Sequence, residues 1–170
     1  ITGYTYDEFN KFNIVKWEEN LHPDDAEKTV TALNEAIRSG NDFIYEYRFR
    51  IKDGTYVYLF EHGTCIADNN GNVYRMLGTM RDITELKNAE KLQNAVFKIS
   101  EAAITSATLD ELYQSIHNII SEIIFAKNFY IAIYDREHHL LRFPYFVDEI
   151  DEYVSEQKFG RGLTEYVIRT

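Results

Sequence analysis

The sequence predicts an α+β fold, in which an antiparallel sheet with flanking helices is joined by a connecting helix to a second mixed domain. Three observations carry this prediction. Apolar residues alternate along residues 43–51, turn residues then interrupt the strand-like stretch twice, and residues 83–103 contain neither Gly nor Pro. A period of two is typical of a half-buried strand, whereas apolar residues every three or four positions favour a helix.

A first helix is expected over residues 26–39. Asp24 or Asp25 can cap its N-terminus, and Gly40 can end it. Its inner face would carry three apolar residues: Val30, Leu33 and Ile37.

Three strands are expected next, at residues 43–51, 56–67 and 73–80. Lys52-Asp53-Gly54 and Asp68-Asn69-Asn70-Gly71 supply the turns between them. The first strand is rich in aromatic residues on alternate positions: Phe43, Tyr45, Tyr47, Phe49 and Ile51. Consecutive strands with tight turns form an antiparallel meander.

A connecting helix should follow the meander. Its apolar residues recur at steps of three and four, which is typical of a coiled-coil seam: Ala89, Leu92, Val96, Ile99 and Ala103. We therefore expect Leu92, Val96 and Ile99 to be buried against a partner helix or the adjacent domain.

The sequence of the second half predicts a helix, a β-hairpin and a short final helix. Thr108 and Glu111 have the spacing of a capping box, which places the start of the first of these helices. Strands are expected at residues 128–134 and 140–146, the acidic stretch 148–152 reads as a loop, and the last helix should span 163–168.

Composition excludes several classes of protein. The net charge is −10, without a basic face for nucleic acid or an anionic membrane, and no run of residues is apolar enough for a membrane-spanning helix. The single cysteine, Cys65, allows no internal disulfide, so a reduced cytoplasmic setting is expected. The chain starts at Ile1 without a signal peptide, and we expect it to be a piece of a longer protein.

The first half resembles a PAS domain of the sensory-box type. The resemblance rests on five motifs in order: GYTYDEF (3–9), HPDD (22–25), YEYRFRIKDGTYVYL (45–59), DNNG (68–71) and GTMRDITELKNAE (78–90). The stretches 128–152 and 160–170 resemble the front of a GAF domain. The expected domains are a PAS-like domain at 1–85 without its first strands, a signalling helix at 86–106, and a GAF-like domain at 107–170 without its C-terminal part.

The resemblance implies a sensory segment of a signalling protein, with a histidine kinase as the first expected output. The alternatives are regulation of a cyclic-di-GMP synthesising or degrading domain, a small-molecule enzyme working in one of the two domain cavities, and a purely dimerising module. The resemblance also implies that Asp82, Ile83 and Thr84 form the signal outlet, with Arg48 as a candidate partner of Asp82. The alternative is a plain helix cap, because Asp82 or Thr84 can accept hydrogen bonds from the first turn of the following helix. The chain would form a homodimer, act on an output domain of the same polypeptide and catalyse no reaction itself.

The ligand pocket is expected beside the aromatic strand, with Tyr45, Tyr47, Phe49 and Arg48 as candidates. Arg48 can clamp a carboxylate ligand or simply be a surface strand residue. By resemblance, haem would need a histidine in the first helix and flavin a reactive cysteine motif, and both are absent. We therefore expect neither cofactor, although an unidentified small ligand remains open.

Histidines offer little for a metal site. His138 and His139 are adjacent on a turn, where side chains diverge, and His22 suits a loop anchor. His117 lies on a helix without an acceptor-box context and is expected to be structural. No metal site and no catalytic group are predicted.

Overall fold

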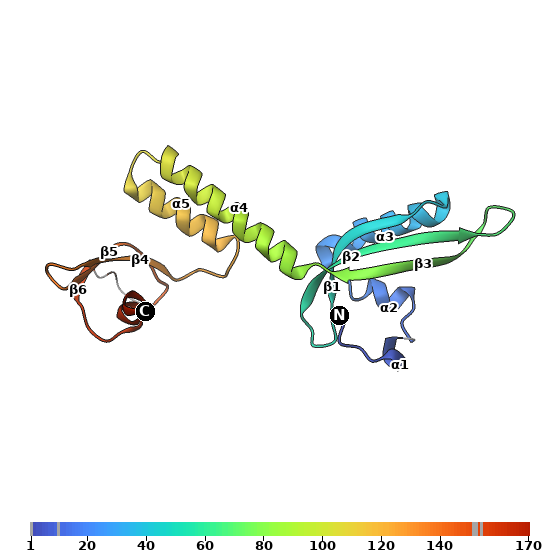
Figure 1. The fold of residues 1–170 in the computed structure, drawn as a ribbon, viewed down its shortest axis with the longest axis horizontal. Coiled ribbons are helices and arrows are strands. Elements are labelled where there is room, and N and C mark those ends of the chain that lie inside the picture. The colour runs from blue at the N-terminus through green and yellow to red at the C-terminus, as the bar shows by residue number, and fades with distance from the viewer. Residues whose placement is uncertain (1, 10, 151–152, 154) are drawn as a thin grey trace. The chain divides into compact units, whose positions relative to one another are not determined.

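The computed structural model describes residues 2–9, 11–150, 153 and 155–170. The chain divides into two compact units, Ile1–Ala89 and Glu90–Thr170, and each is described by itself. Figure 1 shows the elements in chain order. The mixed helix and strand architecture, with an antiparallel sheet in the first unit, agrees with the predicted α+β class.

The described residues of the first unit form these elements in order: α1 (Tyr6–Phe9), α2 (Ile14–Glu18), α3 (Pro23–Ser39), β1 (Phe43–Arg50), β2 (Tyr56–Ala67), β3 (Val73–Asp82) and the start of α4 (Thr84–Thr105). The short helices α1 and α2 were not expected from the sequence. A local cap explains α2, because the side chain of Asn13 accepts a hydrogen bond from the backbone of Lys16 at 2.9 Å.

The sheet is the predicted meander, with strand order β1-β2-β3 and antiparallel pairing throughout. Tyr47 lies opposite Leu59, and both belong to the core. The hydrophobic core of this unit joins the sheet to α3 and to the segment before it: Leu21, Leu33, Ala36, Phe43, Tyr47, Phe49 and Leu59.

Helix α3 begins earlier than expected. His22 caps it, since its Nδ1 accepts a hydrogen bond from the backbone of Asp24 at 3.2 Å. The buried face is also rotated from the expected one: Thr29, Leu33 and Ala36 are buried, whereas Ile37 is exposed. The predicted end is confirmed, because Gly40 adopts φ 72°, a left-handed conformation that favours glycine.

The second unit continues α4, and its described residues then form α5 (Leu109–Ser121), β4 (Phe129–Asp135), β5 (Leu140–Val147), β6 (Glu156–Lys158) and α6 (Leu163–Arg169). Its sheet has the order β4-β5-β6 and is antiparallel. The capping box is confirmed at its first bond, 3.3 Å from the Glu111 backbone nitrogen to Thr108 Oγ1. Strand β6 was not expected, and part of the predicted loop 148–152 lies outside the described residues.

Helices α4 and α5 run side by side (Figure 1), and Lys98 Nζ lies 2.6 Å from Glu122 Oε2. The residue of α4 that is buried is Ala95, at 5% exposure. Leu92 and Val96 are exposed, and Ile99 is half-buried. The single chain therefore leaves most of the predicted seam uncovered.

Candidate functional site

A pocket of about 440 Å³ lies in the first unit between the segment around α2 and one face of β2 and β3. Its walls are mostly aromatic, aliphatic and thioether side chains, with a few polar groups: Phe12, Asn13, Ile14, Trp17, Phe49, Glu61, Met76, Gly78, Thr79 and Met80. This volume lies within the usual range for small-molecule sites, and such a lining is typical of them.

A buried hydrogen-bond chain links the pocket wall to the core. The hydroxyl of Tyr47 donates to Glu61 Oε2, and the indole Nε1 of Trp17 donates to the same hydroxyl at 3.1 Å. The Trp17 and Tyr47 rings also meet edge to face, with centroids 5.7 Å apart. These contacts fix the carboxyl group of Glu61 from two other elements, β1 and α2.

Burial changes the acidity of both partners. Burial, the charge of Glu61 and the hydrogen bond to it raise the pKa of Tyr47 well above its ordinary value. Burial also raises the pKa of Glu61, and the hydrogen bond from Tyr47 only partly opposes this shift. Tyr47 therefore remains a neutral donor at physiological pH, and the charge of Glu61 is only partly compensated.

The second carboxylate oxygen of Glu61, Oε1, has no partner among the residues that the structure describes. Within those residues no fully buried side-chain oxygen or nitrogen lacks a hydrogen-bond partner. Oε1 is therefore not fully buried, and because Glu61 lines the pocket, this oxygen can accept a hydrogen bond.

The predicted pocket residues are placed differently from one another. Phe49 lines the pocket, and Tyr47 lies behind Glu61 with 2% of its surface exposed. Tyr45 is not part of the lining and stacks on Phe43 at 5.8 Å.

Arg48 points to another site. Its guanidinium contacts both carboxylate oxygens of Asp25 at 2.8 Å, and Asp24 lies 3.3 Å away. The hydrogen bond and charge of Arg48 lower the pKa of Asp25 to about 2. The expected pair with Asp82 is thus replaced by an ion pair that ties the start of α3 to β1, and this arginine does not line the pocket.

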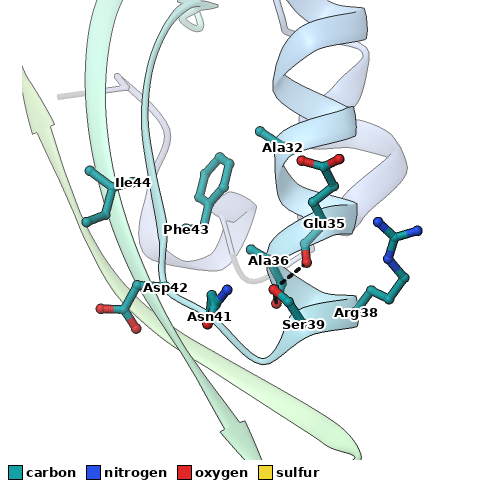
Figure 2. A pocket seen from close by; sticks show the side chains of 9 residues that line it. All are labelled: Ala32, Glu35, Ala36, Arg38, Ser39, Asn41, Asp42, Phe43 and Ile44. Atoms are coloured by element: carbon teal, nitrogen blue, oxygen red, sulfur yellow. Dashed lines mark hydrogen bonds between the residues drawn. The ribbon is translucent and has the colours of Figure 1, made fainter.

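A second pocket of about 380 Å³ lies between the C-terminal end of α3 and the start of β1. Figure 2 shows Phe43 pointing toward α3, with Ile44 on the opposite side of the strand. Its lining contains three ionisable side chains, Glu35, Arg38 and Asp42, and Asp42 is paired with His62 at 2.8 Å.

The predicted signal outlet is fastened to the middle strand. Asp82 Oδ1 accepts a hydrogen bond from the backbone of Thr84 at 2.9 Å, which is the expected capping interaction. Thr84 Oγ1 accepts from the backbone of Tyr58 at 2.9 Å, and the backbone of Ile83 donates to the Tyr58 carbonyl at 2.9 Å. Ile83 is 4% exposed. The start of α4 is therefore hydrogen-bonded to β2 through Tyr58.

The sequence analysis did not identify Glu61, Trp17 or the two methionines of the pocket lining, Met76 and Met80. A signal for Glu61 was present, because it continues the inward alternation of Val57 and Leu59 on β2. An acidic side chain at an inward position of a sheet is unusual, because Glu is mostly exposed in folded proteins.

Gly78 also belongs to the pocket for a structural reason. It lies opposite Gly63 in the sheet, and a Cβ there would come within 2.6 Å of the His62 carbonyl oxygen. Only glycine fits this approach.

The histidines have local partners. His138 Nδ1 lies 3.0 Å from Asp135, and His117 lies 2.7 Å from the Ala126 carbonyl and stacks on Phe129. Across the described ranges, no three His, Cys, Asp or Glu side chains gather as a metal site would need. The helices in the described part of the chain are all too short or too polar to cross a membrane.

Comparison with known proteins places these observations in a family. Residues 1–80 match the model of the PAS fold. The methyl sulfide methyltransferase-associated sensor of Methanosarcina acetivorans is 29% identical over 140 residues, 82% of this chain and 14% of that protein. The peroxide stress-activated histidine kinase mak1 of Schizosaccharomyces pombe is 30% identical over 64% of this chain and 6% of that protein.

Among solved structures, a sensory box histidine kinase/response regulator from Burkholderia thailandensis is 26% identical, with a TM-score of 0.46. The match covers 56% of this chain and 70% of that one. The chain spans 4–14% of the length of the curated relatives that it matches. The meander, the pocket and the family match together identify residues 1–80 as a PAS domain of the kind found in signalling proteins.

Proposed function

We propose that this chain is the sensory and regulatory segment of a multidomain signal-transduction protein, a sensor histidine kinase, and that its PAS domain senses a small ligand. The observation that carries the proposal is the pocket with the accessible carboxylate of Glu61 inside a PAS domain. The histidine kinases among the relatives favour this output over a cyclic-di-GMP enzyme. Native mass spectrometry of freshly purified chain tests the ligand: a retained small molecule supports sensing, and a mass equal to that of the bare chain contradicts it.

Transmission would run through Asp82, Ile83 and Thr84 into α4. Two hydrogen bonds between this connector and Tyr58 support the proposal, because they link the start of the helix directly to β2. In the full-length protein, Asp82→Ala should leave the PAS domain folded and reduce the range of output activity between unstimulated and stimulated states. Asp110→Ala, in the first turn of α5, is the matched control. A normal response range with Asp82→Ala would reduce Asp82 to a helix cap.

A homodimer would cover the seam of α4. Leu92 and Val96 are exposed in the single chain, and each such side chain contributes about 1.5–3 kcal/mol when buried. Combining Val96→Asp with Ile99→Asp should convert a dimer to a monomer in sedimentation, whereas Gln93→Asp, on the same helix, should not. An unchanged sedimentation coefficient for the double variant would exclude this seam.

The second unit would be the front part of a GAF domain. Its antiparallel sheet with α5 and α6 supports this assignment. We propose that the segment acts in the cytoplasm, contacts neither nucleic acid nor the membrane interior, holds no haem or flavin, and leaves catalysis to an output domain of the same polypeptide. Visible absorption of the purified protein beyond the aromatic range would overturn the cofactor part.

A further inference from the structure

We propose that the pocket between α2 and the β2–β3 face takes a ligand with a protonated amine attached to an apolar or aromatic body, and that the Glu61 carboxylate is its ion partner. This inference rests on the proposed function, because it names the class of molecule that the same pocket would sense. It depends on three properties of the pocket: its charge, the orientation of its carboxylate and the chemistry of its walls.

The charge in the pocket is negative and poorly compensated. Glu61 is the one acidic or basic side chain in the described lining. No Lys, Arg or His pairs with it in the described part of the chain, where its partner is the neutral hydroxyl of Tyr47. A carboxylate in apolar surroundings loses hydration that a neutral hydroxyl only partly replaces. A ligand cation would supply the missing compensation.

The carboxylate is oriented before a ligand arrives. The Tyr47 hydroxyl donates to Oε2, and Trp17 donates to the same hydroxyl at 3.1 Å, while Oε1 has no described partner and is not fully buried. A fixed acceptor reduces the entropy lost on binding. A hydrogen bond from an ammonium group to a carboxylate is also roughly twice as strong as a bond between neutral groups.

The walls suit an apolar body beside that charge. Phe12 and Trp17 present aromatic rings, and Met76 and Met80 add polarisable thioethers. Aromatic faces attract cations as well as apolar groups. The same carboxylate would repel an anionic ligand, so the pocket discriminates by charge as well as by fit.

This inference is tested by three probes that share a phenyl ring and a two-carbon chain and that end in a positive, a neutral or a negative group. The probes are 2-phenylethylamine, 2-phenylethanol and 3-phenylpropanoate at neutral pH, titrated into the whole chain. Binding is followed by the fluorescence of Trp17, the one tryptophan, and checked by calorimetry. The amine should bind about tenfold or more tightly than the alcohol, as expected for a charged hydrogen bond, and the acid should bind most weakly.

Two variants connect the preference to Glu61. Glu61→Gln should bind the amine and the alcohol within about twofold of each other, because the charged acceptor is lost. Glu46→Gln is the matched control, since Glu46 lies on the same sheet and pairs with Lys87 at 2.6 Å. Met80→Lys is the second variant. Met80 lies opposite Glu61 in the sheet, so the ammonium group of the introduced lysine should form an ion pair with the Glu61 carboxylate and abolish the preference for the amine probe.

The possible outcomes distinguish failure of the amine preference from failure of ligand sensing itself. If the alcohol binds the wild-type chain as tightly as the amine, the pocket is a ligand site and the amine preference is wrong. If Glu61→Gln and Met80→Lys both keep the preference, Glu61 is not its source and the inference is overturned. If no probe binds, the inference is overturned as well, whereas ligand sensing itself is still decided by native mass spectrometry.

Discussion

The two units bury their apolar residues to very different extents. In the first unit, Tyr47, Phe49 and Leu59 are each at most 2% exposed and form one cluster with α3. In the second unit, Leu141 is fully buried, but Phe125 and Leu163 are exposed at 85% and 84%. A sheet covered by helices thus has a continuous core in one unit and a thin core in the other.

This difference indicates which unit is stabilised more by interactions among its own residues. The first unit combines apolar packing with the Glu61 chain and the Arg48–Asp25 pair, and these fix one arrangement of its parts. The second unit presents large apolar side chains that its own described residues do not cover. We therefore expect the first unit to dominate the stability of the chain, and variants can test that expectation.

The largest effect is expected in the first core. Phe49→Ala should lower the free energy of unfolding by about 3–5 kcal/mol, because it removes a buried ring and leaves a cavity. Urea unfolding followed by Trp17 fluorescence measures it, since this tryptophan lies in the first unit. Phe125→Ala, at an 85% exposed position, should change the same value by less than about 0.5 kcal/mol. Equal losses would contradict the comparison.

The next effect concerns the second core. Leu141→Ala should cost about 2–4 kcal/mol in the unfolding of that unit, since Leu141 is 0% exposed. Circular dichroism should report the loss, while the urea midpoint from Trp17 fluorescence should stay in place. A parallel shift of both signals would show that the two units unfold as one cooperative body.

A smaller effect should depend on pH. The pKa of Asp25 is about 2 in the folded chain, below its ordinary 3.8, so its stabilising contribution is present above pH 4 and is lost as pH falls from 3.8 toward 2. Asp25→Asn should cost about 1–2 kcal/mol at pH 7, after allowance for solvent screening, and progressively less below pH 4. Asp7→Asn, at an exposed position, is the control. A cost independent of pH would mean that the charge of Asp25 is not what stabilises the start of α3.

The smallest effect should come from a helix cap of the second unit. Thr108→Ala removes the acceptor for the Glu111 backbone nitrogen and should cost about 1 kcal/mol. Thermal unfolding by circular dichroism compares it with Thr31→Ala, an exposed change on α3. If both variants melt alike, the capping box contributes nothing measurable to the second unit.

Local patterns predicted the sheet of the first unit closely. Strand β2 has the expected bounds, because the turn residues that limit it are its immediate neighbours in the sequence. Strand β6 could not be predicted, since its three residues are polar and exposed and form a strand only by pairing with β5. The start of α3 was misplaced because a histidine cap has no common sequence signature.

The pocket was harder to predict than the sheet. The alternation in β1 indicated which face of the strand is buried, and Phe49 does line the pocket. The partner of Arg48 lies 23 residues away, and Trp17 lies 30 residues from Tyr47. Neither pairing therefore produces a local sequence pattern from which it could be predicted. Long-range polar contacts of this kind depend on the completed fold.

The same difference in chain separation has a kinetic consequence. The meander joins neighbouring strands through tight turns, and such hairpins form in about 1–10 μs. The outer wall of the pocket instead depends on distant contacts, such as Trp17 with Tyr47 and the backbone of Arg50 with the Asn20 carbonyl at 2.8 Å. Distant contacts form later than local ones, because more of the chain must be ordered before they can form. We therefore expect the segment around α2 to complete the pocket only after the sheet beneath it has paired.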